Sequence, residues 1–116
     1  MKNRKPFARA VACLFILSLL ASMAVGADDK AKAAYKTNCV SCHGSDGSGT
    51  PLGKSMQAAD LSSQQVQSKS DAELATVIHD GKNNMPGFKN TLNDEQIQGV
   101  VKYVRELGKN KQSSEK

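Results

Sequence analysis

The sequence predicts an all-α fold of three to four helices, and three observations carry this prediction. Apolar residues near the C-terminus recur every three or four positions, the spacing that places side chains on one face of a helix: they are Ile97, Val100, Val101, Val104 and Leu107. Two polar clusters match the capping box that begins many helices. No segment alternates apolar and polar residues as a half-buried strand does.

The first 26 residues have the organisation of a secretory signal peptide. Four basic residues lie within the first nine, an apolar run covers residues 10–20, and small residues follow up to Ala27. The apolar run is shorter than the roughly 20 residues that span a membrane. Cleavage fits after Gly26 or after Ala27, and an uncleaved N-terminal anchor is the alternative. We expect a leader over residues 1–26, removed on export to the periplasm.

The positive charge of the chain belongs mainly to this leader. The formal net charge is +5. Residues 1–26 hold four of the sixteen Lys and Arg residues and none of the eleven Asp and Glu residues, which leaves twelve bases, eleven acids and a net charge of +1. No basic stripe interleaved with aromatic residues is present. We therefore expect no nucleic-acid partner and, after cleavage, no membrane span.

The first helix of the exported domain is expected over residues 29–38. Acidic residues at its start suit the positive end of a helix dipole. Its small and aromatic face consists of Ala31, Ala34 and Tyr35. Glycines and a proline then crowd residues 44–55, and this composition predicts a loop.

A short helical turn is expected over residues 63–67, followed by a better-marked helix. Ser70 and Glu73 form a capping box at its start, and Gly81 is placed to end it. One apolar face follows the helical spacing: Leu74, Val77 and Ile78.

The last helix begins at a second capping box, made by Asn93 and Gln96. We expect Gly108 to end this helix. The domain then covers residues 27–108, and the polar residues 109–116 form a flexible C-terminal tail.

The strongest chemical signal is the sequence Cys39-Val40-Ser41-Cys42-His43. Cys-x-x-Cys-His is the spacing of a covalent haem c attachment site. Two thiols one helical turn apart can each bond one former vinyl group on the same porphyrin edge, and the next residue places its imidazole beneath the iron. The motif predicts Cys39 and Cys42 as thioether residues and His43 as the proximal iron ligand.

Three other interpretations of the motif fit less well. A structural zinc site needs four ligands, and beyond this cluster residues 27–116 add only His79. A thioredoxin-like pair belongs beside a βαβ pattern, which the sequence lacks. A disulfide at this spacing would close a trivial loop and add little stability. A domain this small usually needs a stronger stabilising feature to complete its core, and a covalently bound haem would supply one.

Met85 is the expected second iron ligand. It lies in a loop between two predicted helices, directly before Pro86, and a residue before proline is held extended and out of helix. Met56 is the rival methionine, too close to the attachment motif to reach the opposite haem face easily. His79 is the other candidate, and its place late in an amphipathic helix is more typical of an exposed histidine.

With Cys39–His43 near the start of the domain and Met85-Pro86 before the last helix, the chain resembles the class I c-type cytochromes, in particular the small single-haem bacterial type. The resemblance covers residues 29–108. It implies a cytochrome c fold, in which the first and last helices cross and three to four helices surround one haem. Ala31 and Tyr35 match the crossing positions on the first helix, although glycine is common in the family where Ala31 stands.

The resemblance also implies roles for other residues. Pro51 matches the proline whose carbonyl accepts the hydrogen bond from the proximal histidine. The haem crevice would be lined by Leu52, Leu61, Leu74 and Phe88.

The expected function is that of a one-electron carrier between respiratory redox partners, with His43 and Met85 as axial ligands. We expect no enzyme activity, a donor and an acceptor protein as partners, and a monomer. Two alternatives stay open. One is a gas-binding sensor in which Met85 is labile, and the other is a haem subunit of a larger membrane oxidoreductase.

Overall fold

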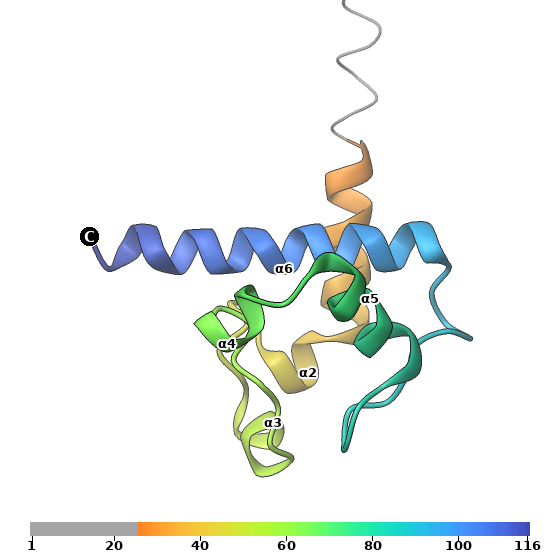
Figure 1. Cartoon of the computed structure of the whole chain (residues 1–116), viewed down its shortest axis with the longest axis horizontal. Helices are drawn as coiled ribbons and strands as arrows, with labels where there is room; N and C mark the ends of the chain where they lie inside the picture. The colour runs from red at the N-terminus through yellow and green to blue at the C-terminus, as the bar shows by residue number, and fades with distance from the viewer. Residues whose placement is uncertain (1–25) are drawn as a thin grey trace, which may run out of the picture.

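A computed structural model describes residues 26–116 of the chain (Figure 1). Apart from Gly26, the expected signal peptide lies outside the described residues. Within the described part, none of the helices is long and apolar enough to cross a membrane.

The described residues form an all-α fold. The first helix covers residues 26–38. It is followed by α2 (Val40–His43), α3 (Pro51–Ser55), α4 (Gln64–Gln67), α5 (Asp71–Asp80) and α6 (Asp94–Ser114). The only strand-like pairing among residues 26–116 is an isolated bridge between Lys82 and Met85. The predicted fold class is therefore confirmed.

The first helix crosses α6, as Figure 1 shows. The rings of Tyr35 and Tyr103 meet at this crossing with their centroids 4.9 Å apart. A Cβ atom added to Gly99 would lie 3.1 Å from the Cβ of Ala31. Because α6 contributes a glycine where the first helix has an alanine, the two helices approach closely despite the departure at Ala31.

The core lies where α5 and the first helix pack on α6. Its most completely buried side chains are Tyr35, Val100 and Val101. The apolar stripe predicted on the last helix is buried throughout: Ile97, Val100, Val101, Val104 and Leu107. Leu74 and Ile78 of α5 complete the contact.

Both predicted capping boxes are confirmed. The backbone N–H of Glu73 donates to Ser70 Oγ at 3.1 Å, and Glu73 Oε2 accepts from the Ser70 N–H at 2.7 Å. Asn93 and Gln96 exchange the corresponding two bonds, each at 2.9 Å. Gly81 follows α5 at φ 81°, as predicted for the residue past a helix end.

Arg105 of α6 fixes the junction between α4 and α5. Its guanidinium donates to the carbonyl of Gln67 at 2.8 Å and pairs with the Asp71 carboxylate at 2.9 Å. The Gln67 amide in turn donates to the carbonyls of Leu61 and Val104 at 2.7 and 3.0 Å. These contacts join the short α4 to the long last helix.

The prediction of an unbroken loop over residues 44–55 is wrong, because α3 occupies its second half. Thr50 Oγ1 accepts from the Gly53 N–H at 3.1 Å, and Pro51 stands at the first helical position. Both residues are typical of a helix start. Gly53 is required by packing, since an added Cβ would overlap the carbonyl of Cys42.

The prediction that Gly108 ends the last helix is also wrong, since α6 continues to Ser114. Gly108 is buried, and a Cβ there would lie 2.5 Å from the side-chain amide carbon of Gln67. The glycine therefore provides space for a neighbour instead of terminating the helix. Lys111, in the segment expected to be a flexible tail, pairs with Asp60 at 3.0 Å.

We predict that Gly53→Ala destabilises the protein by about 1–3 kcal/mol, because the added methyl group overpacks the backbone of Cys42. The measurement is the free energy of unfolding in urea. Lys54→Ala, the adjacent exposed position of α3, is the control and should change stability by no more than about 0.5 kcal/mol. Equal stabilities of the two variants would contradict the close contact.

Candidate functional site

The Cys39–His43 segment forms one helical turn. Cys39 is the N-cap residue of α2, and its carbonyl accepts from the His43 N–H at 2.9 Å. Both cysteines are free thiols, Cys39 buried and Cys42 partly exposed. Before the cofactor is attached, burial, followed by the nearby Cys42, raises the pKa of the Cys39 thiol to about 11.

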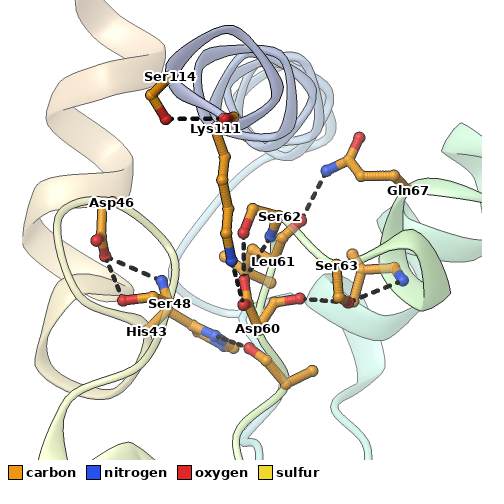
Figure 2. Close-up of polar contacts among 12 residues, drawn as sticks. His43, Asp46, Ser48, Asp60, Leu61, Ser62, Ser63, Gln67, Lys111 and Ser114 are labelled. Atoms are coloured by element: carbon orange, nitrogen blue, oxygen red, sulfur yellow. Dashed lines mark hydrogen bonds and ion pairs between the residues drawn. The ribbon is translucent and has the colours of Figure 1, made fainter. Parts of the chain in front are cut away.

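His43 is buried, and its orientation is fixed by one hydrogen bond. Its Nδ1 lies 3.1 Å from the carbonyl oxygen of Ala59 (Figure 2). Because a carbonyl only accepts, Nδ1 carries the proton and Nε2 has a free lone pair. Burial lowers the pKa of His43, and the bond to Ala59 opposes this shift. The neutral imidazole is the form that binds a metal ion.

The expectation that Pro51 supplies this acceptor is wrong, because Ala59 does so. Pro51 is exposed at the first position of α3. A residue there directs its carbonyl along the helix axis. The acceptor comes instead from the irregular segment between α3 and α4.

Met85 lies in a tight turn at the end of α5. The N–H of each of Lys82 and Met85 donates to the other's carbonyl at 3.0 Å. Beyond the turn, the Phe88 and Lys89 N–H groups donate to the carbonyls of Ile78 and His79 at 2.9 and 3.1 Å. The turn is thus closed by its own backbone bonds and joined to α5 by the residues that follow it, and Met85 is half-buried against the core.

The two rival ligands are placed differently. Met56 follows α3 with 38 % of its surface exposed. Its carbonyl accepts from the Asn84 side chain at 3.1 Å. The side chain of His79 is 43 % exposed and contacts the Asp80 carboxylate at 2.7 Å through Nδ1. An exposed and paired histidine is the arrangement expected of a surface residue.

The predicted crevice residues fall into two groups. Leu74 is buried in the core, and Leu61 and Phe88 pack against it. Pro51 and Leu52 are exposed on α3, Leu52 with 55 % of its surface. Leu52 and Met56 are the exposed large hydrophobic residues of the described chain. Leu52 lies on α3 and Met56 directly follows it, and Gly53 of the same helix packs against Cys42.

These residues fit a covalently bound haem. Two thiols stand one turn apart, a neutral imidazole has a free Nε2, and uncovered apolar side chains lie close to the attachment turn. Within residues 26–116, no group of three or more His, Cys, Asp and Glu side chains is arranged to hold a metal ion. The donor set therefore favours a porphyrin, which brings its own nitrogen ligands, over a structural zinc ion.

Sequence reasoning missed the segment that supports His43. Ala59 contributes only its backbone, which has no sequence signature. Two Asp-x-Ser turns, Asp46-Gly47-Ser48 and Asp60-Leu61-Ser62, lie beside it (Figure 2). The repeated Asp-x-Ser motif is the one feature of the sequence that could have indicated this segment.

Comparison with known proteins gives a consistent set of relatives. Residues 26–104 match the protein family described as cytochrome C oxidase, cbb3-type, subunit III. Cytochrome c6 of Thermosynechococcus vestitus is 36% identical over 105 residues, which cover 90% of this chain and 91% of that protein. Cytochrome c6 of Thermostichus vulcanus gives the same values.

A solved structure is also similar. The KustC0563 c-type cytochrome superposes with a TM-score of 0.62 at 31% sequence identity. The match covers 66% of this chain and 94% of that one.

We predict that Cys42→Ala leaves haem attached through a single thioether at Cys39. The α band of the pyridine haemochrome should then move to longer wavelength, because one vinyl group stays conjugated with the ring. Ser41→Ala, the exposed position between the two thiols, is the matched control and should keep the band of the unmodified protein. An unchanged band in Cys42→Ala would contradict the assignment of this thiol.

Proposed function

The chain belongs to the c-type cytochrome family, and from this premise we propose that it is a one-electron carrier between respiratory redox partners in the periplasm, with His43 and Met85 as its axial ligands. It is an electron carrier rather than an enzyme, and it carries one covalently bound haem c. The observation that carries the proposal is the buried His43, whose Nδ1 is occupied by Ala59 and whose Nε2 is free.

Cys39 and Cys42 would hold the cofactor through thioether bonds, and His43 and Met85 would hold its iron. When bound, haem supplies an iron that cycles between the ferrous and ferric states. The two residues that would bind the iron are each held by a backbone contact and would move little during this cycle. His43 is fixed by Ala59, and Met85 by the paired backbone bonds with Lys82. A fixed ligand set means that little rearrangement accompanies electron transfer.

The choice of Met85 as second ligand also bears on the reduction potential. A thioether raises the potential of a haem relative to a second imidazole. His43 is buried, and a buried apolar site disfavours the additional positive charge that a ferric iron would carry. Both effects favour the ferrous state, as suits a carrier that accepts electrons readily.

The export proposal rests on residues 1–26, whose basic start, apolar run and small residues are typical of a signal peptide. Covalent attachment fits this location, because a cofactor lost outside the cytoplasm is not readily replaced. The respiratory assignment is supported by the matching family, whose description names an oxidase subunit.

We predict that Met85→Ala abolishes the weak Met-to-iron charge-transfer band at the red end of the ferric spectrum. The reduction potential should fall by on the order of 0.1 V, within the range that axial ligands set. The reduced variant should bind carbon monoxide rapidly. Met56→Leu is the matched control and should keep the band and the potential.

The same measurement decides between the carrier and a gas sensor. A carrier keeps Met85 bound, so the unmodified reduced protein should bind carbon monoxide slowly. Rapid binding by the unmodified protein, or loss of the band in Met56→Leu instead, would overturn the ligand assignment.

A second candidate function is a haem subunit of a larger membrane oxidoreductase, favoured by the description of the matching family. Against it, the chain spans 91% of a cytochrome c6, a protein of similar length. We expect the expressed protein to be recovered from the periplasmic fraction as a monomer, without residues 1–26. Recovery in washed membranes with an intact N-terminus would favour the subunit.

A further inference from the structure

The carbonyl that orients His43 lies in a segment without regular structure. Ala59 stands between α3 and α4 and is itself exposed. On its N-terminal side, the Ala58 N–H donates to the carbonyl of Gly53 at 2.8 Å. No helix fixes the direction of the Ala59 carbonyl, so contacts of the neighbouring residues must do so.

Asp60 supplies most of those contacts. Its carboxylate accepts from the Ser62 N–H at 2.9 Å, from the Ser62 hydroxyl, and from Lys111 Nζ at 3.0 Å (Figure 2). Its carbonyl accepts from the Ser63 hydroxyl at 2.6 Å. Ser62 is buried, so one end of this small network is anchored in the protein interior.

The contacts of Asp60 act directly on Ala59. The carbonyl of Ala59 and the N–H of Asp60 belong to one planar peptide group. Because this group is rigid, fixing the backbone of Asp60 also fixes the direction of the Ala59 carbonyl. The next residue is fixed as well, since the Leu61 N–H donates to the carbonyl of Gly47 at 2.9 Å.

We propose that Asp60 is a positioning residue for the iron ligand: its carboxylate, held by Ser62 and Lys111, aims the Ala59 carbonyl at Nδ1 of His43. This inference rests on the proposed role of His43 as axial ligand. A hydrogen bond at Nδ1 fixes the ring and raises the basicity of Nε2. A more basic ligand stabilises the ferric state, so Asp60 lowers the reduction potential through Ala59.

The chain contains a matched control for this proposal. Asp46 accepts from the Ser48 N–H at 3.0 Å and from its hydroxyl at 2.7 Å, the same Asp-x-Ser turn. Hydrogen bonds from Ser48 lower the pKa of Asp46. Burial raises the pKa of Asp60, but the bonds from Ser62 and Lys111 outweigh it and the net shift is downward. Both carboxylates are ionised at neutral pH, and only Asp60 adjoins the acceptor of His43.

The experiment compares haem-loaded Asp60→Ala, Asp60→Asn and Asp46→Ala with the unmodified protein. The two readouts are the reduction potential and the exchange rate of the His43 Nδ1 proton, followed by NMR in the ferrous state. Asp60→Ala should exchange this proton about tenfold faster, the change expected when one hydrogen bond is weakened. Its potential should rise more than that of Asp46→Ala, which loses the same charge.

Asp60→Asn keeps an oxygen for Ser62 and should retain slow exchange, so it serves as the conservative rescue. Lys111→Ala should have a small effect, because partly exposed ion pairs contribute little. If Asp60→Ala does not fold, Ser62→Ala removes one donor to the carboxylate and should give intermediate exchange. Unchanged exchange in Asp60→Ala or Ser62→Ala, or equal effects at Asp46 and Asp60, would overturn the proposal.

Failure of the proposed function would look different. If His43 is not an iron ligand, its Nδ1 proton in the unmodified protein will lack the shift caused by the haem ring current. That result concerns the unmodified protein alone, whereas the role of Asp60 is decided by the differences among variants.

Discussion

The candidate site depends on holding a single helical turn in place. Val40–His43 has four residues, and a helix of that length does not form by itself in water. Its position is set from outside. The Tyr35 hydroxyl donates to the carbonyl of Gly44 at 2.7 Å, and Thr50 Oγ1 donates to that of Ser41 at 2.7 Å. Gly53 packs against the backbone of Cys42. These contacts hold the two cysteine side chains and the imidazole of His43 on one turn. The turn by itself would not be stable enough to do so.

The crossing of the first helix with α6 is the frame for these contacts. Tyr35 is almost completely buried against Tyr103 at the crossing, and its hydroxyl reaches the residue that follows the attachment turn. Burial raises the pKa of Tyr35, so the hydroxyl stays protonated and able to donate. The close approach at Ala31 and Gly99 therefore contributes, through Tyr35, to the position of His43. A wider crossing would move the tyrosine, and with it the end of α2.

The parts of this arrangement that are local were predictable from the sequence, and those that depend on backbone contacts were not. The capping boxes at Ser70 and Asn93 involve residues three positions apart, so their pattern is visible in the chain. Cys39–His43 is equally compact, and Pro86 indicates that its neighbour Met85 lies in a loop, as the structure shows. The acceptor of His43 could not be predicted, because Ala59 contributes a carbonyl that every residue has. Its choice over Pro51 follows from the path of the chain after α3.

Gly108 shows why a residue type alone does not determine its role. In an isolated helix a glycine near the end favours termination, but here the missing side chain admits Gln67. The Gln67 amide donates to the carbonyls of Leu61 and Val104, which joins the last helix to the Asp60-Leu61-Ser62 turn.

The whole of α6 spans 21 residues, about 30 Å at 1.5 Å per residue. Because the helix is this long, its final turns bring Lys111 to Asp60. The same helix thus crosses the first helix near one end and supports the acceptor of His43 near the other. The glycine permits both, because a side chain at that position would separate α6 from the segment it supports.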